Sequence, residues 1–97
     1  MTRSPGAPRP DARHLRLLDE AVTTLERVGP NARAPELRGA LGAIDRLRDG
    51  LRALDSAALP DGFMERLTSA RLDLNLGDPE GALAALRGLR AELVERR

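Results

Sequence analysis

The only histidine of the chain, His14, is the side chain best suited to carry chemistry. An imidazole near the start of a bundle helix is typical of phosphotransfer domains, which expose one such histidine on four helices. The residues from Ala12 to Leu17 lack the glycine and the local pattern expected around such a site. No Glu precedes His14 by three or four residues, the spacing that a helical metal motif requires. We therefore expect His14 to be exposed, with neither a catalytic nor a metal-binding role.

Two carboxylates, Asp45 and Asp49, are spaced by one helical turn and could share a cation. Each aspartate is followed three residues later by an arginine, Arg48 or Arg52. Opposite charges at this spacing form intrahelical ion pairs worth about 0.2–0.5 kcal/mol. We interpret the four residues as part of a solvated charged face, and we expect no metal ion and no cofactor.

Arginine supplies all 16 cationic side chains, since lysine is absent. Its planar fork suits phosphate or carboxylate, although codon usage in a high-GC genome would also enrich arginine together with alanine, glycine and proline. The residues of one helical segment that could contact phosphates are Arg38, Arg46, Arg48 and Arg52. The formal net charge of +1, the interspersed aspartates and the single aromatic residue argue against nucleic acid as the partner. A small DNA- or RNA-binding regulator that uses these arginines and the basic tail is the alternative function.

Nucleophilic catalysis finds no support in the sequence. No histidine or lysine base is positioned beside the hydroxyl side chains, such as Thr23, Thr24, Ser56, Thr68 and Ser69. The absence of cysteine excludes thiol catalysis, disulfides and thiolate metal sites. No glycine-rich loop follows a strand, so the fingerprints of nucleotide binding are missing as well. We expect a protein that is not an enzyme and has no catalytic residues.

Apolar residues recur at alternating steps of three and four in four segments, which places them on one face of an α-helix. The four stripes are Leu15, Leu18, Val22 and Leu25; Leu37, Ala40, Ile44, Leu47, Leu51 and Leu54; Phe63, Leu67, Ala70 and Leu74; and Ala82, Leu86, Leu89 and Leu93. A chain of 97 residues suffices for one domain. We predict an all-α fold, an antiparallel up-down bundle of four amphipathic helices, over residues 11–97.

Proline, glycine and capping residues set the expected ends of the helices. Three prolines predict a disordered N-terminal tail over residues 1–10, and Asp11 can cap the first helix. Gly29 ends that helix, and Pro35 opens the second, which should extend to about Ala57.

The sharpest local signal is the link between the third helix, expected over residues 62–76, and the fourth. Gly77 suits the left-handed position after a helix end, Asp78 suits an N-cap, and Pro79 suits the first helical position. So short a link predicts an antiparallel hairpin.

A second apolar face on the third helix indicates a partner. Leu72 and Leu76 point away from the stripe of that helix, and Ser69 shares their face. Leu17 and Leu41 also lie beside or beyond the stripes of their helices. Such residues either widen the core or bury a second face against another chain. The predicted partner interface comprises Leu72, Leu76, Ser69, Leu17 and Leu41.

Residues 67–93 resemble part of a tetratricopeptide-type helical hairpin. Ala70 precedes the helix end at residues 76–78, and Glu80, Ala82, Leu86 and Leu89 follow at about the spacing of that repeat. The aromatic residues usual in the first helix are missing, and no second copy occurs at a period of about 34 residues. The resemblance implies binding of a peptide or protein in a groove.

The expected location is the cytoplasm. No segment approaches the roughly 18 consecutive apolar residues of a membrane span, and residues 1–10 lack the apolar stretch of a secretory signal. We expect no binding to membranes. The favoured function is a non-enzymatic protein-interaction or self-association module (an adaptor, regulator or assembly subunit) that forms a homo-oligomer or binds another protein.

Overall fold

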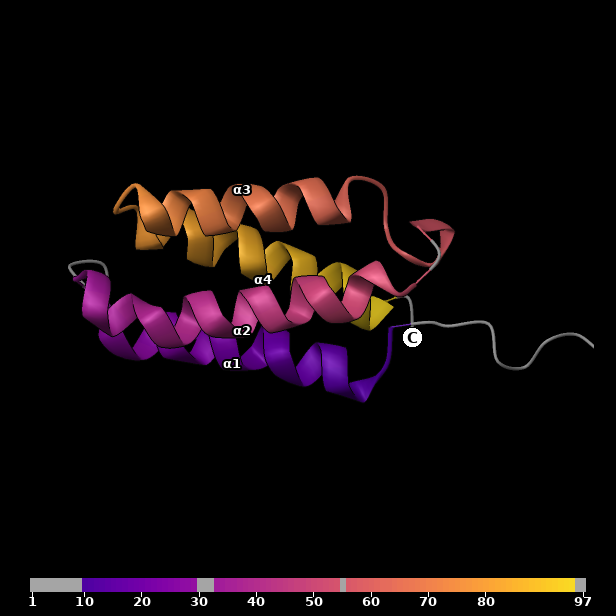
Figure 1. The fold of residues 1–97 in the computed structure, drawn as a ribbon, viewed down its shortest axis with the longest axis horizontal. Coiled ribbons are helices and arrows are strands. Elements are labelled where there is room, and N and C mark those ends of the chain that lie inside the picture. The colour runs from indigo at the N-terminus through magenta and orange to yellow at the C-terminus, as the bar shows by residue number, and fades with distance from the viewer. Residues whose placement is uncertain (1–9, 30–32, 55, 96–97) are drawn as a thin grey trace, which may run out of the picture.

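A computed structural model gives the fold of the chain and describes residues 10–29, 33–54 and 56–95. Within these residues there is no strand, and the α-helices are α1 (Ala12–Val28), α2 (Ala34–Arg52), α3 (Phe63–Asn75) and α4 (Pro79–Glu95). The helices pack side by side as a bundle (Figure 1), which confirms the all-α class. The tail expected over residues 1–10 lies, apart from Pro10, outside the described residues.

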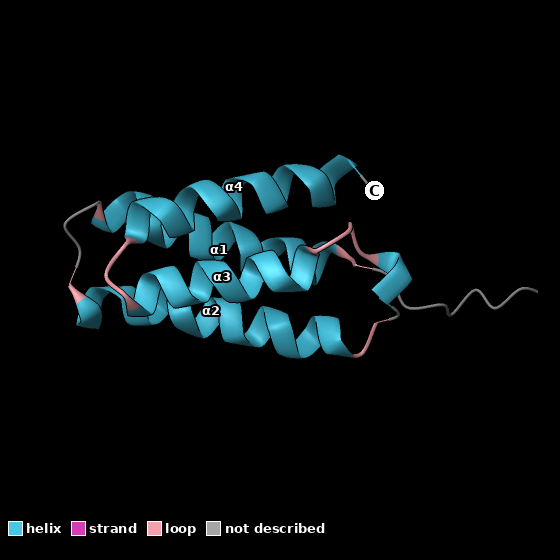
Figure 2. Cartoon of the chain, turned by 90° about the horizontal axis from the view of Figure 1, so that it is seen from above, coloured by secondary structure: helices cyan, strands magenta, loops and turns pink. Residues whose placement is uncertain are grey.

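Each helix packs against two others. α1 contacts α2 and α4, and α3 contacts the same two helices, so α1 and α3 occupy opposite corners of the bundle (Figure 2). The most extensive packing is between α1 and α2, and the least extensive is between α2 and α3.

The core is almost entirely aliphatic, as the composition predicts. Leu18, Leu47, Leu67 and Leu86, one from each helix, are fully buried, and Phe63 is 1% exposed at the start of α3. Burial of each such side chain contributes about 1.5–3 kcal/mol. One continuous core therefore joins the four helices.

The turn between α3 and α4 has the predicted capping geometry. Gly77 has a φ of 82°, and its N–H donates to the carbonyl of Leu74 at 3.2 Å. The N–H of Asp78 donates to the carbonyl of Asp73 at 2.8 Å. These two bonds make a Schellman motif. The Asp78 carboxylate then accepts from the N–H of Gly81 at 3.0 Å and so caps α4.

The second helix is shorter than predicted. It ends at Arg52 rather than near Ala57, so Leu54, expected to continue the apolar stripe, lies beyond the helix. The N–H of Leu54 donates at 3.0 Å to a carbonyl of the last turn, and residues 56–58 form a 3-10 helix. The chain has to reverse before α3, and the tight turn places Leu59 in the core at 5% exposure. Tertiary packing thus ends a helix that the apolar pattern alone would continue.

Candidate interaction surface

Leu72 and Leu76 are the most exposed large apolar side chains of the described residues, at 54% and 74%. Ser69, one turn before Leu72, is exposed as well. Steps of three and four residues separate the three positions, so they follow one outer face of α3 and its C-terminal cap. The structure therefore brings together three of the five residues predicted for the partner interface.

The other two predicted residues, Leu17 and Leu41, are half-buried and pack against the core. Leu41 lies near the middle of α2. Leu17 lies towards the start of α1, where it lines a cavity with His14 and Leu54. The five residues are thus distributed over α1, α2 and the outer face of α3 with its C-terminal cap.

The outer face of α3 carries the exposed carboxylate of Glu65, and the partly buried Asp73 lies beside it. The other exposed residues of this face are Thr68, Ser69, Leu72, Asn75 and Leu76. Arg71, in the same stretch, is partly buried and binds Asp45 of α2, with 2.6 Å between Nε and Oδ1. A partner that buries Leu72 and Leu76 would have to leave the Glu65 carboxylate in water or supply it with a cation.

Ion pairs join every pair of neighbouring helices. The N···O distances are 3.2 Å for Arg46–Glu20 between α2 and α1, 2.6 Å for Arg71–Asp45 between α3 and α2, and 2.5 Å for Arg87–Glu26 between α4 and α1. Arg90–Asp19 is a second pair between α4 and α1, and Arg66–Glu92 joins α3 to α4. Many of the charged side chains are therefore already engaged within the molecule.

Arg66 holds the start of α3 to α4. Both of its terminal nitrogens bind the Glu92 carboxylate, with 2.7 Å between Nη2 and Oε1. Nη2 also donates to the carbonyl of Asp61 at 2.9 Å, and Nε donates to that of Gly62 at 3.3 Å. Hydrogen bonding by the guanidinium lowers the pKa of Glu92, and the same bond raises the pKa of Arg66. The contact is therefore a charged one at neutral pH.

Three of the four arginines proposed as phosphate contacts lie beside carboxylates. Arg46 binds a glutamate of α1, while Arg48 and Arg52 lie 3.9 Å and 3.5 Å from the aspartates three residues before them. The two intrahelical pairs confirm the predicted charge spacing. Arg38 is exposed. The four arginines therefore do not form a cluster of unpaired guanidinium groups that could bind phosphates together.

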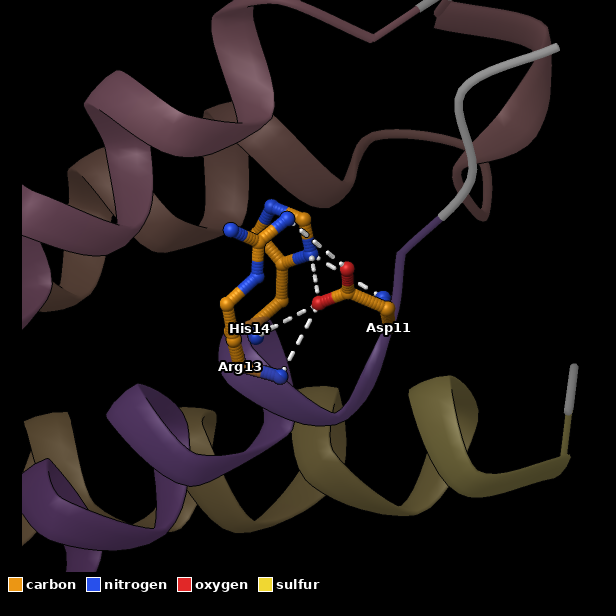
Figure 3. A network of polar contacts seen from close by, with 3 residues as sticks. All are labelled: Asp11, Arg13 and His14. Carbon is orange, nitrogen blue, oxygen red and sulfur yellow. Dashed lines mark hydrogen bonds and ion pairs between the residues drawn. The ribbon is translucent and has the colours of Figure 1, made fainter. Parts of the chain in front are cut away.

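His14 is buried, at 8% exposure, so the expectation of an exposed histidine was wrong. Its Nδ1 accepts from the N–H of Asp11 at 3.0 Å, and the Asp11 carboxylate accepts from the N–H groups of Arg13 and His14 at 2.9 Å and 3.4 Å (Figure 3). The two residues thereby form a capping box for α1. The imidazole lies against Gly50 of α2, where a Cβ atom would be 3.3 Å from the ring. The missing side chain of Gly50 provides the space that His14 fills.

A cavity of about 370 Å³, open to the surface, lies between the end of α1 and the start of α4. Its apolar walls are Leu25, Gly29, Pro79 and Leu83. The ion pair Arg87–Glu26 and the side chain of Glu80 line it as well. The cavity could not be predicted from the sequence, because its two sides lie far apart along the chain and no local pattern marks either one.

The described part of the chain contains no group of three or more His, Asp or Glu side chains that could hold a metal ion. Among the same residues, no helix combines the length and the apolar character needed to cross a bilayer.

Comparisons with protein-family models, with curated proteins and with solved structures find no match to this chain. The segment that resembles a tetratricopeptide hairpin forms α3 and α4. Four of the residues that carry the resemblance, Ala70, Ala82, Leu86 and Leu89, are fully buried in the core of the bundle. Their side chains pack the four helices together and are not accessible to a peptide.

Proposed function

We propose that this protein is a non-enzymatic self-association module of the cytoplasm, serving as an adaptor, regulator or assembly subunit. The observation that carries the proposal is the exposure of Leu72 and Leu76, at 54% and 74%, on the outer face of α3. Apolar surface removed from water contributes about 25 cal/mol per Å². Contact with a second copy would remove Leu72 and Leu76 from water.

The proposed scaffold is an antiparallel up-down bundle of amphipathic helices. Only three residues, 76–78, separate α3 from α4, and so short a connection favours antiparallel neighbours. In Figure 1 the colour gradient along the chain shows that successive helices begin at alternate ends of the bundle. The buried residues of α1 and α4 recur mostly at steps of three and four, while the intervening positions are mainly exposed or partly buried.

The distribution of charge supports a protein partner rather than nucleic acid. Nucleic-acid binding depends on arginines that are free to neutralise phosphates. Arg46, Arg66, Arg71, Arg87 and Arg90 instead bind carboxylates of neighbouring helices. Leu72 and Leu76 of α3 lie outside this set of ion pairs.

Light scattering on a size-exclusion column, across a dilution series, tests the proposal. The wild-type protein should form an oligomer that dissociates on dilution. The double variant Leu72→Ser/Leu76→Ser should be monomeric at the same concentrations and keep its helicity by circular dichroism.

Val94→Ser is the matched control, because Val94 is also exposed, at 44%, but lies near the end of α4. It should leave the oligomer intact. A wild-type monomer at every concentration would reject self-association, and loss of helicity in the double variant would assign the two leucines to the core.

A further inference from the structure

We propose that protonation of His14 switches the start of α1 between two hydrogen-bonded arrangements of Asp11. In the arrangement that the structure shows, the imidazole accepts the backbone N–H of Asp11. In the second arrangement, the imidazolium donates to the Asp11 carboxylate and the backbone N–H is released. This switch does not depend on self-association, because His14 lies on α1 and the exposed leucines belong to α3 and its C-terminal cap.

The neutral ring carries its proton on Nε2. Nδ1 accepts from the N–H of Asp11 at 3.0 Å (Figure 3), so Nδ1 has no proton of its own. This bond is the backbone half of the capping box, in which His14 occupies the position that Glu or Gln ordinarily holds. Histidine is the side chain whose ordinary titration falls between about pH 5 and 8. An imidazole at this position therefore makes the cap sensitive to protons.

A second partner for Nδ1 is already in place. The Oδ1 atom of Asp11 lies 3.1 Å from Nδ1. A proton on Nδ1 would face the Asp11 N–H as donor against donor, whereas the carboxylate would accept it in a charge-assisted bond. The same carboxylate accepts from the N–H groups of Arg13 and His14, so α1 remains capped by the Asp11 side chain in both arrangements.

The carboxylate is ionised where the switch has to operate. The Arg13 guanidinium binds Oδ2 of Asp11 at 3.1 Å and therefore does not block Oδ1. Hydrogen bonding by Arg13 lowers the pKa of Asp11, so this group is charged at every pH at which a histidine ordinarily titrates. A charged acceptor is thus available to the imidazolium.

The second helix places no ionised group in the cavity beside the ring. His14, Asp11 and Arg13 share this cavity with Leu17, Gly50, Ala53 and Leu54. The charged residues of α2 nearest to Gly50 pair along their own helix. Asp49 lies 3.5 Å from Arg52, and Arg48 lies 3.9 Å from the aspartate three residues before it.

The fourth helix also packs against α1, and its last turn lies at the same end of the bundle as the start of α1 (Figure 1). Its carboxylates there are Glu92, which is bound to Arg66, and Glu95, which is exposed. Neither lines the cavity beside His14. Among the described residues, the Asp11 carboxylate is therefore the acceptor placed to receive the Nδ1 proton.

Protonation changes the chain at the point where it enters α1. Loss of the bond to Nδ1 frees the peptide unit between Pro10 and Asp11, while the carboxylate still holds the first turn of the helix. The bundle keeps its four helices, and the direction of the chain before Ala12 is no longer fixed by the ring. The switch is therefore a local one that re-aims the chain without unfolding the domain.

Nuclear magnetic resonance of the isotope-labelled full chain tests the switch, and the ring signals are unambiguous because His14 is the only histidine. At about pH 8, the ring-nitrogen shifts should show an unprotonated Nδ1, and a scalar coupling across the hydrogen bond should join Nδ1 to the Asp11 amide nitrogen. At about pH 5, with the ring protonated, that coupling should vanish. Exchange of the Asp11 amide hydrogen, corrected for its intrinsic pH dependence, should become at least several-fold faster, with unchanged helicity by circular dichroism.

His14→Gln is the matched control, because glutamine accepts the N-cap N–H in an ordinary capping box and does not titrate. Its Asp11 amide should keep the same protection at both pH values, and an equal loss of protection in acid would overturn the switch. A neutral wild-type ring with its proton on Nδ1 would also overturn it. So would an Asp11 amide that stays protected after the wild-type ring is protonated, and these two readouts decide even if the variant does not fold.

Discussion

The imidazole of His14 on α1 lies against the backbone of Gly50 on α2, where a Cβ atom would be 3.3 Å from two ring atoms. The glycine and the histidine thus form one packing unit between the two most closely packed helices. This unit explains a glycine in the interior of a helix, where it would otherwise be unfavourable by about 0.5–1 kcal/mol relative to alanine.

Alanine substitutions of three helical glycines should separate this packing role from helix propensity. Gly39 and Gly88 have room for a methyl group, because the nearest atom to the first is 3.6 Å away and nothing lies within 4 Å of the second. Gly39→Ala and Gly88→Ala should each stabilise the fold by about 0.5–1 kcal/mol. Gly50→Ala should give no such gain, because the new methyl group crowds His14. Urea unfolding measures the three changes, and an equal gain at Gly50 would contradict the packing role.

Acid should weaken the contact between Arg66 and Glu92. The pKa of Glu92 in the folded protein lies below its ordinary value of 4.5, chiefly because Arg66 hydrogen-bonds the carboxylate. A lowered folded pKa means that the contribution to stability is complete above the ordinary value and is lost as the pH falls through the folded one. The difference in unfolding free energy between wild type and Glu92→Gln should therefore be largest near neutral pH and should disappear in acid. A difference that is independent of pH would show that the ion pair does not stabilise the fold.

Phe63 should be among the most sensitive core positions. It is the only aromatic residue and is 1% exposed at the start of α3. Phe63→Ala removes most of the side chain and leaves a cavity, so the expected loss is about 3–5 kcal/mol. Phe63→Leu retains apolar volume and should cost clearly less. Denaturant unfolding of both variants measures the two losses of stability. A larger loss for Phe63→Leu than for Phe63→Ala would contradict the prediction.

Random duplex DNA should bind weakly near physiological salt. Arg46, Arg48 and Arg52 lie beside carboxylates, so these three guanidinium groups are less available to displace counterions from the phosphates. An electrophoretic gel shift across a salt series should show no steep salt dependence, and alanine variants of the three arginines should behave as wild type. Tight binding that weakens with salt and is lost in those variants would instead support a nucleic-acid function.

Local sequence determines much of this fold, and contacts between distant residues determine the rest. The apolar spacing identifies the helices, and Gly77 with Asp78 identifies the turn between α3 and α4 in detail, because these signals act within a few residues. The burial of His14 depends on Gly50, which is distant in sequence. The ion pairs join residues 26, 61 and 71 positions apart. The α1–α4 cavity likewise requires two helix ends that only the folded chain brings together.

Asp45 and Arg46 are adjacent on α2, yet they pair with opposite neighbours, Arg71 of α3 and Glu20 of α1. Four helices with the same connections can be arranged around their axis in two mirror-related orders. In the reversed order, Arg46 would face Arg71 and Asp45 would face Glu20, so like charges would meet at both interfaces. The alternation of charge at two consecutive residues of α2 therefore favours the observed order of the helices over its mirror image.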